Sequence, residues 1–285
     1  MLKTGDVVGI TACSDPLPLE KQSVIDLLEE RLRGFGLIPK ISPILYKASA
    51  NGEERAKILM EYYESDLIKA VFDVSGGNLA NETLEYLNYE TLKAHPKPFF
   101  GYSDLTVLLN GIYKKTGNPV YLYQVRNLLG NDGEQQSEKF VDSLLQGKDS
   151  LFQISWKWIQ GSRMEGVVIG GNLRCFLKLA GTSYMPDFRG KLLFLESYGG
   201  GETQVRTLLA QLRHMGVYRR ISGLLLGTFT RLEQECGAET LVRLVQSSVG
   251  DPTLPIALTK EVGHGSDAKC LPIGRNCSLD AGTEG

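Results

Sequence analysis

The stretch that decides the fold is Pro98-Phe99-Phe100-Gly101-Tyr102-Ser103-Asp104-Leu105-Thr106. Two aromatic residues lead into Gly101, and apolar residues at helical spacing follow at once, at Leu105, Leu108, Leu109, Ile112 and Tyr113. The pattern predicts a buried strand that turns sharply into a helix. The residue at such a turn is exposed at the end of the sheet, beside the first amides of the helix.

Ser103 lies at this predicted turn, and two interpretations of it are open. Its hydroxyl is a candidate nucleophile presented above the end of a sheet. Alternatively, Ser103 or Asp104 only caps the helix, because both residue types satisfy free amides at a helix start. The stretch alone is compatible with both interpretations, so the choice depends on the rest of the chain.

Strand-like and helical patterns alternate on both sides of this stretch. Apolar runs at 6–12, 38–45, 70–74 and 99–100 are separated by helical patterns at 19–35, 51–65 and 81–86. Such alternation predicts βαβ units and a mostly parallel sheet. Ligands of such sheets bind at the carboxyl ends of the strands, where Ser103 lies.

The composition becomes polar from Asn131 onward, and the chain then resumes with shorter strands. We predict two domains, residues 1–155 and 156–285. In the second, strands are expected at 152–158, 165–169, 191–195, 221–229, 256–262 and as a final pair within 270–279, with helices at 173–180, 203–215 and 239–249.

Composition excludes several classes of protein. The 285 residues carry a net charge of −2, which predicts no nucleic-acid footprint and no polybasic membrane patch. No apolar run is long enough to span a membrane. The first residues lack the pattern of a signal peptide, so we expect a cytoplasmic protein.

Metal and cofactor sites are not expected. The five cysteines are irregularly spaced and the three histidines show no H-x-x-x-H pattern. Neither a dinucleotide fingerprint nor a phosphate-binding P-loop occurs. Hydrolytic chemistry in this chain would therefore be metal-free.

Two further polar residues lie at predicted strand ends. Glu196 ends a buried run and precedes Ser197-Tyr198-Gly199-Gly200-Gly201, and His264 lies between two glycines. A serine needs a base to become a good nucleophile, histidine suits that role, and a carboxylate can orient the histidine. Each also has an ordinary explanation, since Glu196 could cap a helix or join a loop ion pair, and His264 could be a surface or core histidine.

The pair Gly76-Gly77 follows another predicted strand, at 70–74. It is compatible with a tight turn that needs glycine, or with a turn whose bare backbone amides approach a ligand.

Taken in series, these motifs resemble the LD-carboxypeptidase family, which also contains the microcin C self-immunity peptidases. The resemblance covers essentially the whole chain and is carried by Ser75-Gly76-Gly77, Gly101-Tyr102-Ser103-Asp104, Gly170-Gly171-Asn172-Leu173, Leu193-Phe194-Leu195-Glu196, Gly263-His264 and Leu271-Pro272-Ile273-Gly274. It implies a flavodoxin-like or glutamine-amidotransferase-like parallel-sheet N-terminal domain and a smaller β-rich α+β C-terminal domain, with the active site at their interface. It also implies a homodimer.

The resemblance further implies a role for each site residue. Ser103 would be the nucleophile, His264 the general base and Glu196 its orienting carboxylate. The backbone amides of Gly76, Gly77 and Asp104 would form the oxyanion hole, and Asn172 would contribute to substrate binding. No metal or cofactor is implied.

Two branches of the family differ in substrate. LD-carboxypeptidases release terminal D-alanine from murein tetrapeptides during cell-wall recycling, and the immunity peptidases cleave an aminoacyl-nucleotide amide. The second branch usually has a longer loop with a base-stacking tryptophan, whereas Trp156 and Trp158 fit a strand and no insertion precedes Glu196. We therefore expect a carboxypeptidase acting on murein peptides. A microcin C-type immunity peptidase and a non-catalytic binding protein for murein fragments are the alternatives.

Overall fold

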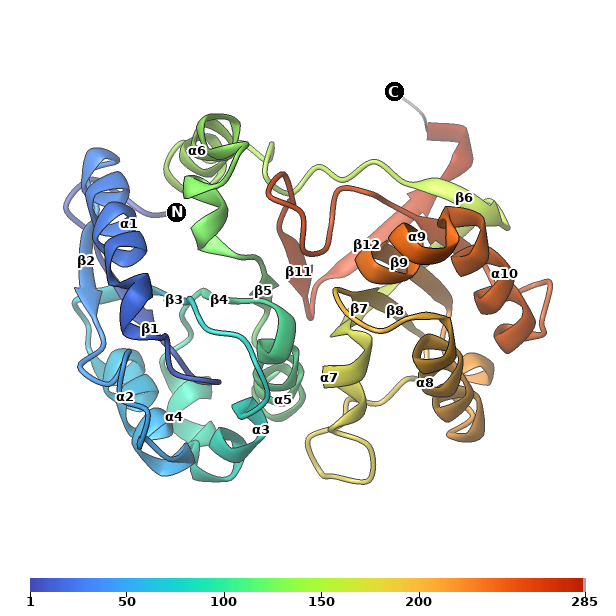
Figure 1. Ribbon diagram of the computed structural model, residues 1–285, viewed down its shortest axis with the longest axis horizontal. Helices are drawn as coiled ribbons and strands as arrows, with labels where there is room; N and C mark the ends of the chain where they lie inside the picture. The colour runs from blue at the N-terminus through green and yellow to red at the C-terminus, as the bar shows by residue number, and fades with distance from the viewer. Residues whose placement is uncertain (284–285) are drawn as a thin grey trace.

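The structure is a computed structural model that describes residues 1–283. The chain folds into two α/β domains that lie side by side (Figure 1). Each is built on a six-stranded sheet, with strand orders β11-β5-β4-β3-β1-β2 and β12-β7-β8-β9-β10-β6. The predicted two-domain fold class, with a parallel-sheet N-terminal domain, is confirmed. The C-terminal domain was expected to be β-rich and of the α+β type, and it has its own mixed sheet with parallel central strands and helices.

The strands of the first sheet are β1 (Val7–Thr11), β2 (Ile38–Ile41), β3 (Ile68–Asp73), β4 (Phe99–Gly101), β5 (Val120–Leu122) and β11 (Leu271–Ile273). Those of the second are β6 (Lys157–Gln160), β7 (Arg163–Asn172), β8 (Lys191–Ser197), β9 (Gly223–Phe229), β10 (Ile256–Leu258) and β12 (Asn276–Asp280). The α-helices are α1 (Gln22–Gly34), α2 (Gly52–Glu64), α3 (Ala80–Thr83), α4 (Tyr89–Ala94), α5 (Thr106–Thr116), α6 (Gly133–Phe140), α7 (Leu173–Leu177), α8 (Glu202–His214), α9 (Thr230–Cys236) and α10 (Ala238–Val249).

Both sheets are parallel in their centres. In the first, β1 to β5 pair in parallel and only β11 is antiparallel, at the edge next to β5. In the second, β7 to β10 are parallel, and β12 and β6 are antiparallel at the two edges. The parallel strands of a sheet all have their carboxyl ends on the same side, and ligands bind there in such folds. The loops after β3, β4 and β8 are therefore the expected place for a site.

The sequence explains where α2 begins. Asn51 accepts a hydrogen bond from the Glu54 amide at 2.9 Å, and the Glu54 side chain accepts one from the Asn51 amide at 3.3 Å. This capping box starts α2 where the sequence predicted it. The helix predicted at 19–35 is also present, as a short 3-10 turn (Leu19–Lys21) that continues into α1.

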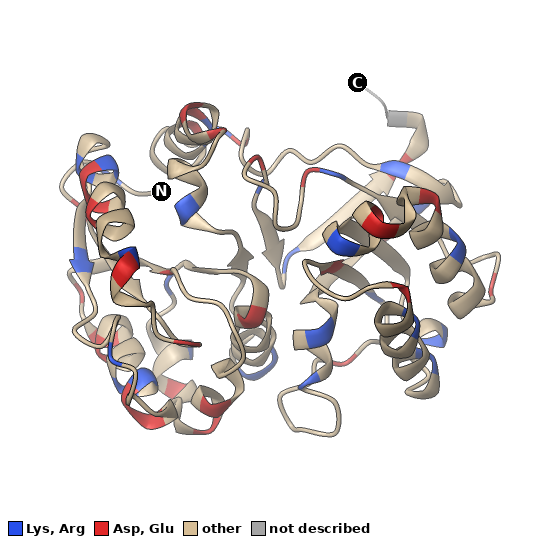
Figure 2. Ribbon diagram, in the orientation of Figure 1, with Lys and Arg blue, Asp and Glu red and all other residues tan. Residues whose placement is uncertain are grey.

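Apolar side chains form two cores. One lies between the first sheet and the helices α1 and α6, and includes Phe72, Phe100 and Phe140. The other begins on the opposite face of the first sheet and continues through α5 and α7 into the second sheet. The two domains thus share one apolar core, and residues of both signs of charge lie on the outer helices (Figure 2).

Some strand predictions are wrong. Residues 152–156 form no strand, because the Ser155 amide bonds to the Glu261 side chain and Trp156 packs edge-on against Phe194. The strand predicted at 256–262 already ends at Leu258. Both strands predicted within 270–279 form, but they do not pair with each other, because β11 joins the first sheet and β12 the second.

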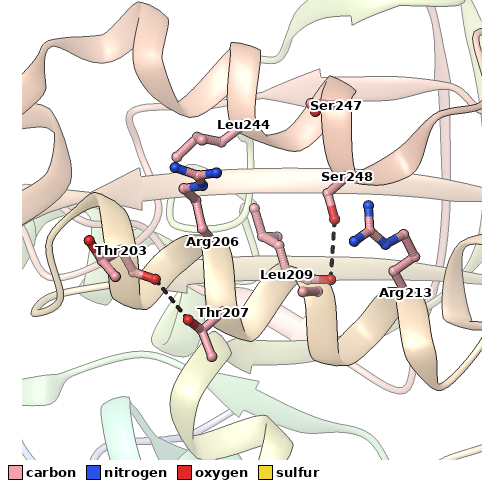
Figure 3. Close-up of a pocket in the computed structure, with 9 residues that line it drawn as sticks. Thr203, Arg206, Thr207, Leu209, Arg213, Leu244, Ser247 and Ser248 are labelled. Carbon is pink, nitrogen blue, oxygen red and sulfur yellow. Dashed lines mark hydrogen bonds between the residues drawn. The ribbon is translucent and has the colours of Figure 1, made fainter.

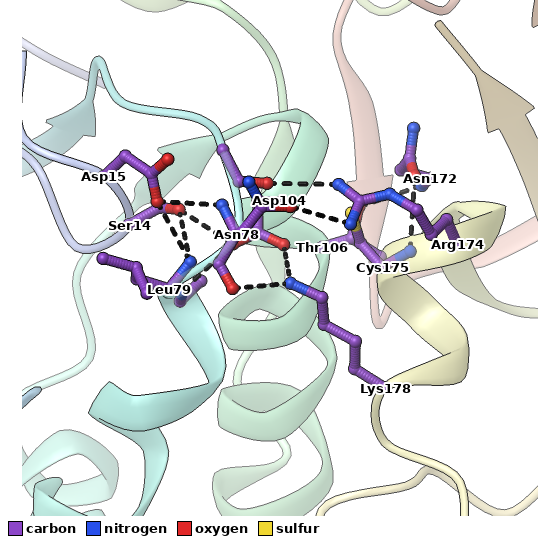
Figure 4. Close-up of polar contacts among 12 residues, drawn as sticks. Ser14, Asp15, Asn78, Leu79, Asp104, Thr106, Asn172, Arg174, Cys175 and Lys178 are labelled. Carbon is purple, nitrogen blue, oxygen red and sulfur yellow. Dashed lines mark hydrogen bonds and ion pairs between the residues drawn. The ribbon is translucent and has the colours of Figure 1, made fainter. Parts of the chain in front are cut away.

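Polar contacts near α7 also join the domains (Figure 4). The Asp104 carboxylate is fully buried and accepts hydrogen bonds from the Ser14 hydroxyl at 2.8 Å and the Ala80 amide at 2.9 Å. From the second domain, Lys178 donates to this carboxylate at 2.5 Å and to the Asn78 carbonyl at 2.8 Å. Since a buried carboxylate needs a counter-charge, Lys178 is the partner that makes the burial of Asp104 tolerable.

We predict that Lys178→Met lowers the free energy of unfolding by about 3 kcal/mol, because it leaves a buried carboxylate without its cation. Urea denaturation monitored by fluorescence would measure the change. The matched control is Lys148→Met, which breaks the more exposed pair with Asp142 (side chains 61% and 31% exposed) and should cost less than about 1 kcal/mol. Equal effects of the two substitutions would contradict the assignment.

Candidate active site

Ser103 occupies a strained turn between β4 and α5. Its φ of +53° makes it the only residue other than glycine with a positive φ among residues 1–283. A left-handed conformation costs a serine about 1–3 kcal/mol, and such strain persists only where the surroundings impose it. The turn sets Ser103 at the start of a 3-10 turn (Ser103–Leu105) that leads directly into α5, as the sequence predicted.

The Ser103 side chain opens onto a cleft of about 740 Å³. The cleft lies along the loops after β1, β3 and β4, and its wall includes Gly76, Gly77, Arg126, Tyr198 and His264. Ser103, Glu196 and His264 also line an adjoining, narrower hollow. Within residues 1–283, no hydrogen bond involves the Ser103 hydroxyl, so it is free to face a bound molecule.

Glu196 and His264 meet beside this cleft. The Nδ1 atom of His264 lies 2.7 Å from Oε2 of Glu196, and the two side chains are 9% and 2% exposed. Asn172 donates from its side-chain nitrogen to the other oxygen, Oε1, at 3.0 Å. Two contacts thus fix the Glu196 carboxylate. Because Nδ1 of His264 faces this carboxylate, Nε2 on the opposite side of the ring points away from it.

Two tyrosine rings hold the imidazole in place. The ring centres of Tyr102 and Tyr198 lie 5.3 Å and 5.0 Å from that of His264. The preceding residue must be glycine, because Gly263 has a φ of +150° and a Cβ there would overlap the Thr228 side chain. His264 itself lies six residues beyond the end of β10 and not at a strand end as predicted.

A chain of contacts across the domain interface links the serine turn to the glutamate. Thr106, in the first turn of α5, accepts a hydrogen bond from the Asn172 amide at 2.9 Å. One turn later, Asn110 bonds both the amide and the carbonyl of Gly170, at 2.9 Å and 2.8 Å. The helix that follows Ser103 therefore fixes the end of β7, and Asn172 on that strand fixes Glu196.

The Gly76-Gly77 turn forms the opposite wall of the cleft. Within residues 1–283, no hydrogen bond uses the amide of either glycine. A Cβ at Gly76 would lie 3.8 Å from the Cβ of Ser103, so this backbone is close to the serine. Gly77 has a φ of +120° and a Cβ there would overlap the Asp15 carboxylate, which explains why glycine is required.

The Asp73 side chain stabilises the Gly76-Gly77 turn through hydrogen bonds to residues beside it. Its buried carboxylate accepts hydrogen bonds from the Cys13 amide at 2.7 Å and from the amide and hydroxyl of Ser75 at 2.8 Å and 2.6 Å. Burial raises the pKa of the Asp73 carboxyl, and these donors partly counteract that effect.

Asp104 contributes differently through its backbone and its side chain. Its carboxylate points into the domain interface, where it binds Lys178. Its amide lies in the first turn of the helix, where an N–H has no intrahelical partner. Of the site residues expected from the sequence, Ser103, His264, Gly76 and Gly77 line one cleft, and Glu196, Asp104 and Asn172 are buried behind it. Asn172 was expected to bind substrate, but its side chain is occupied by Glu196 and the Cys175 amide and lies outside the cleft wall.

Several neighbours of the site were not predicted. Tyr102, Tyr198 and Arg126 line the cleft. Arg174 donates to the Gly77 carbonyl at 3.1 Å and to the Asn78 side chain at 2.9 Å (Figure 4). Tyr102 and Tyr198 had a signal in the sequence, as neighbours of Ser103 and Glu196. Arg126 and Arg174 had none, because their contacts join segments far apart in the chain.

A further hollow, of about 400 Å³, lies between α8 and α10 and is separate from the cleft (Figure 3).

Among residues 1–283, no three His, Cys, Asp or Glu side chains are grouped so as to hold a metal ion. In the same part of the chain, no helix combines the length and apolar character that crossing a membrane requires.

Curated relatives of the chain include peptidases and an immunity protein. It is 27% identical to the probable murein peptide carboxypeptidase of Bacillus subtilis, over 98% of this chain and 90% of the relative. It is 28% identical to the murein tetrapeptide carboxypeptidase of Pseudomonas aeruginosa, over 80% of this chain and 78% of the relative. It is 23% identical to the microcin C7 self-immunity protein MccF of Escherichia coli, over 98% of this chain and 92% of the relative.

Solved structures have the same fold. MccF in complex with glutamyl sulfamoyl guanosine matches with a TM-score of 0.89 at 22% identity, over 99% of this chain and 95% of that chain. The muramoyltetrapeptide carboxypeptidase of Oxalobacter formigenes matches with a TM-score of 0.79 at 23% identity, over 96% and 94%.

The two halves of the sequence match the two domains that define one family. Residues 8–123 match the LD-carboxypeptidase N-terminal domain, and residues 165–279 match the LD-carboxypeptidase C-terminal domain. With the relatives named above, these matches show that the chain belongs to the LD-carboxypeptidase family.

Proposed function

We propose that this protein is a serine-type LD-carboxypeptidase that releases terminal D-alanine from murein tetrapeptides. The observation that carries the proposal is the 2.7 Å contact between Glu196 and His264, on the wall of the cleft into which the strained Ser103 opens. Relatives named as murein peptide carboxypeptidases support the substrate class.

In the proposed reaction, Nε2 of His264 accepts the proton of Ser103 as Oγ attacks the carbonyl carbon of the scissile amide. His264 then gives this proton to the amide nitrogen, the C–N bond breaks, and D-alanine leaves. His264 next accepts a proton from water as the water attacks the ester carbon, the C–O bond to Ser103 breaks, and the shortened peptide leaves as Ser103 regains its proton. Glu196 holds the tautomer with a proton on Nδ1 and stabilises the imidazolium.

The negative charge that develops on the carbonyl oxygen needs fixed donors. The free amides of Gly76 and Gly77, together with the amide of Asp104, are the groups we assign to this role. Loss of one such donor costs about 10²–10³ in rate in other enzymes. Arg174 and Lys178 would act indirectly, because they hold the loops that contain Gly77 and Asp104.

A microcin C-type immunity peptidase is the second candidate, and the similarity to MccF favours it. The two tryptophans argue against a base-stacking role, since Trp158 lies in β6 and Trp156 packs against Phe194. Neither is among the residues that line the cleft. A homodimer stays a prediction from the family resemblance, and a cytoplasmic location stays a prediction from the first residues of the sequence.

We predict that Ser103→Ala abolishes release of D-alanine from disaccharide-tetrapeptide, because no nucleophile remains. Loss of the serine costs about 10⁶-fold in another serine hydrolase. Chromatography of the products would measure release, and Ser247→Ala, in the separate hollow, is the matched control. Normal turnover by Ser103→Ala would refute the mechanism.

Cleavage of an aminoacyl sulfamoyl adenosine without tetrapeptide cleavage would favour the immunity peptidase. Tight binding of murein fragments by wild type without turnover would favour a binding protein.

Glu196→Gln is expected to lower kcat by about 10⁴-fold, because the amide can donate to Nδ1 and so favour the wrong imidazole tautomer. Steady-state kinetics would separate this effect from binding, and KM should change little. A variant that keeps most of its kcat would show that Glu196 does not orient the base.

A further inference from the structure

Arg126 is a cation in the cleft without an acidic partner. It follows β5 and lines the same cleft as Ser103 and His264. None of the ion pairs within residues 1–283 involves it. An unpaired guanidinium beside a nucleophile is well suited to bind an anionic group of a substrate.

The guanidinium is held on one side only. Its Nη2 atom donates to the Tyr102 hydroxyl at 3.0 Å, and its Nε atom is buried with no hydrogen-bond partner in the described chain. Leaving a charged donor buried and unpaired is unfavourable. The side chain is therefore oriented before any ligand arrives, and an acceptor is what it lacks.

Arg126 also lies at the correct end of the cleft. Its partner Tyr102 directly precedes Ser103. A Cβ at Gly76 would lie 3.6 Å from the Tyr102 hydroxyl and 3.8 Å from the Cβ of Ser103. The Tyr102 hydroxyl thus lies between the guanidinium and the Gly76 backbone that we assign to the oxyanion hole, and both groups line the cleft that contains Ser103.

Within residues 1–283, no carboxylate of the cleft wall forms an ion pair with Arg126. Asp15 also lines the cleft, but its Oδ1 atom accepts hydrogen bonds from the amides of Asn78 and Leu79 at 2.9 Å and 3.2 Å. Lys21 adds a second positive charge.

We propose that Arg126 binds the terminal carboxylate of the residue that is released, an inference that rests on the proposed carboxypeptidase function. Consecutive residues are about 3.8 Å apart, so this carboxylate lies one residue beyond the carbonyl that Ser103 attacks. A guanidinium can hold it by two parallel hydrogen bonds. An internal peptide bond offers no carboxylate there, so Arg126 restricts cleavage to the last residue of the chain.

The test compares Nα,Nε-diacetyl-L-Lys-D-Ala with its C-terminal amide. Wild type should prefer the carboxylate by about 10- to 100-fold in kcat/KM, and Arg126→Met should lose this preference, mainly through KM. Arg126→Lys, which keeps a point charge, should retain part of it. Arg219→Met, an exposed arginine outside the cleft, is the matched control, and thermal melting verifies that each variant folds. Preference retained in Arg126→Met, or both peptides slowed equally, would overturn the proposal.

Diaminopimelate supplies a second carboxylate, so the same variants are assayed with peptides that contain it in place of lysine. Loss of a diaminopimelate preference in Arg126→Met, with the carboxylate-over-amide preference intact, would assign Arg126 to the side chain instead and overturn the proposal.

A binding measurement separates this inference from the proposed function. Calorimetry with Ser103→Ala protein compares the same two peptides without turnover. Tighter binding of the carboxylate peptide, lost in Ser103→Ala/Arg126→Met, supports the role of Arg126 even if wild type hydrolyses neither peptide. Equal binding of both peptides, or of neither, overturns it.

Discussion

The buried carboxylate of Asp104 is the contact on which the site depends most. It binds the loop after β1 through Ser14, the start of α3 through Ala80, and the second domain through Lys178. The same residue follows Ser103 in the chain, so its burial also fixes the strained serine turn. A carboxylate without water must be fully paired, and this requirement keeps three segments and two domains in one arrangement.

From this point the interface organises the rest of the chemistry. Along one side, α5 fixes the end of β7 through Thr106 and Asn110, and Asn172 then fixes Glu196. Along the other, Arg174 holds the carbonyl of Gly77. The first domain would supply the nucleophile and oxyanion donors, and the second the base and its carboxylate, so the interface itself positions the proposed groups.

Local patterns in the sequence predicted much of this arrangement. The apolar run into Gly101, the helical spacing after Ser103 and the cap at Asn51 each depend on neighbouring residues only, and they gave β4, α5 and α2 correctly. The alternation at 152–158 was misleading, because Trp156 packs against Phe194 of a distant strand and not within a ladder. Arg126, Lys178 and Arg174 contact residues 24, 74 and 97 positions away in the chain, and periodicity holds no information about such pairs.

The split of β11 and β12 between the two sheets has a consequence for how the domains move. The chain crosses between the two sheets three times: before β6, between β10 and β11, where it returns to pair with β5, and between β11 and β12, where it pairs with β7. Three covalent crossings and a shared apolar core restrict relative rotation of the domains more than a single linker would. The crossings also make the first domain a discontinuous unit, because a fragment ending near residue 155 would expose β5 as a bare edge. Separate expression of that half would therefore need β11 grafted back onto it.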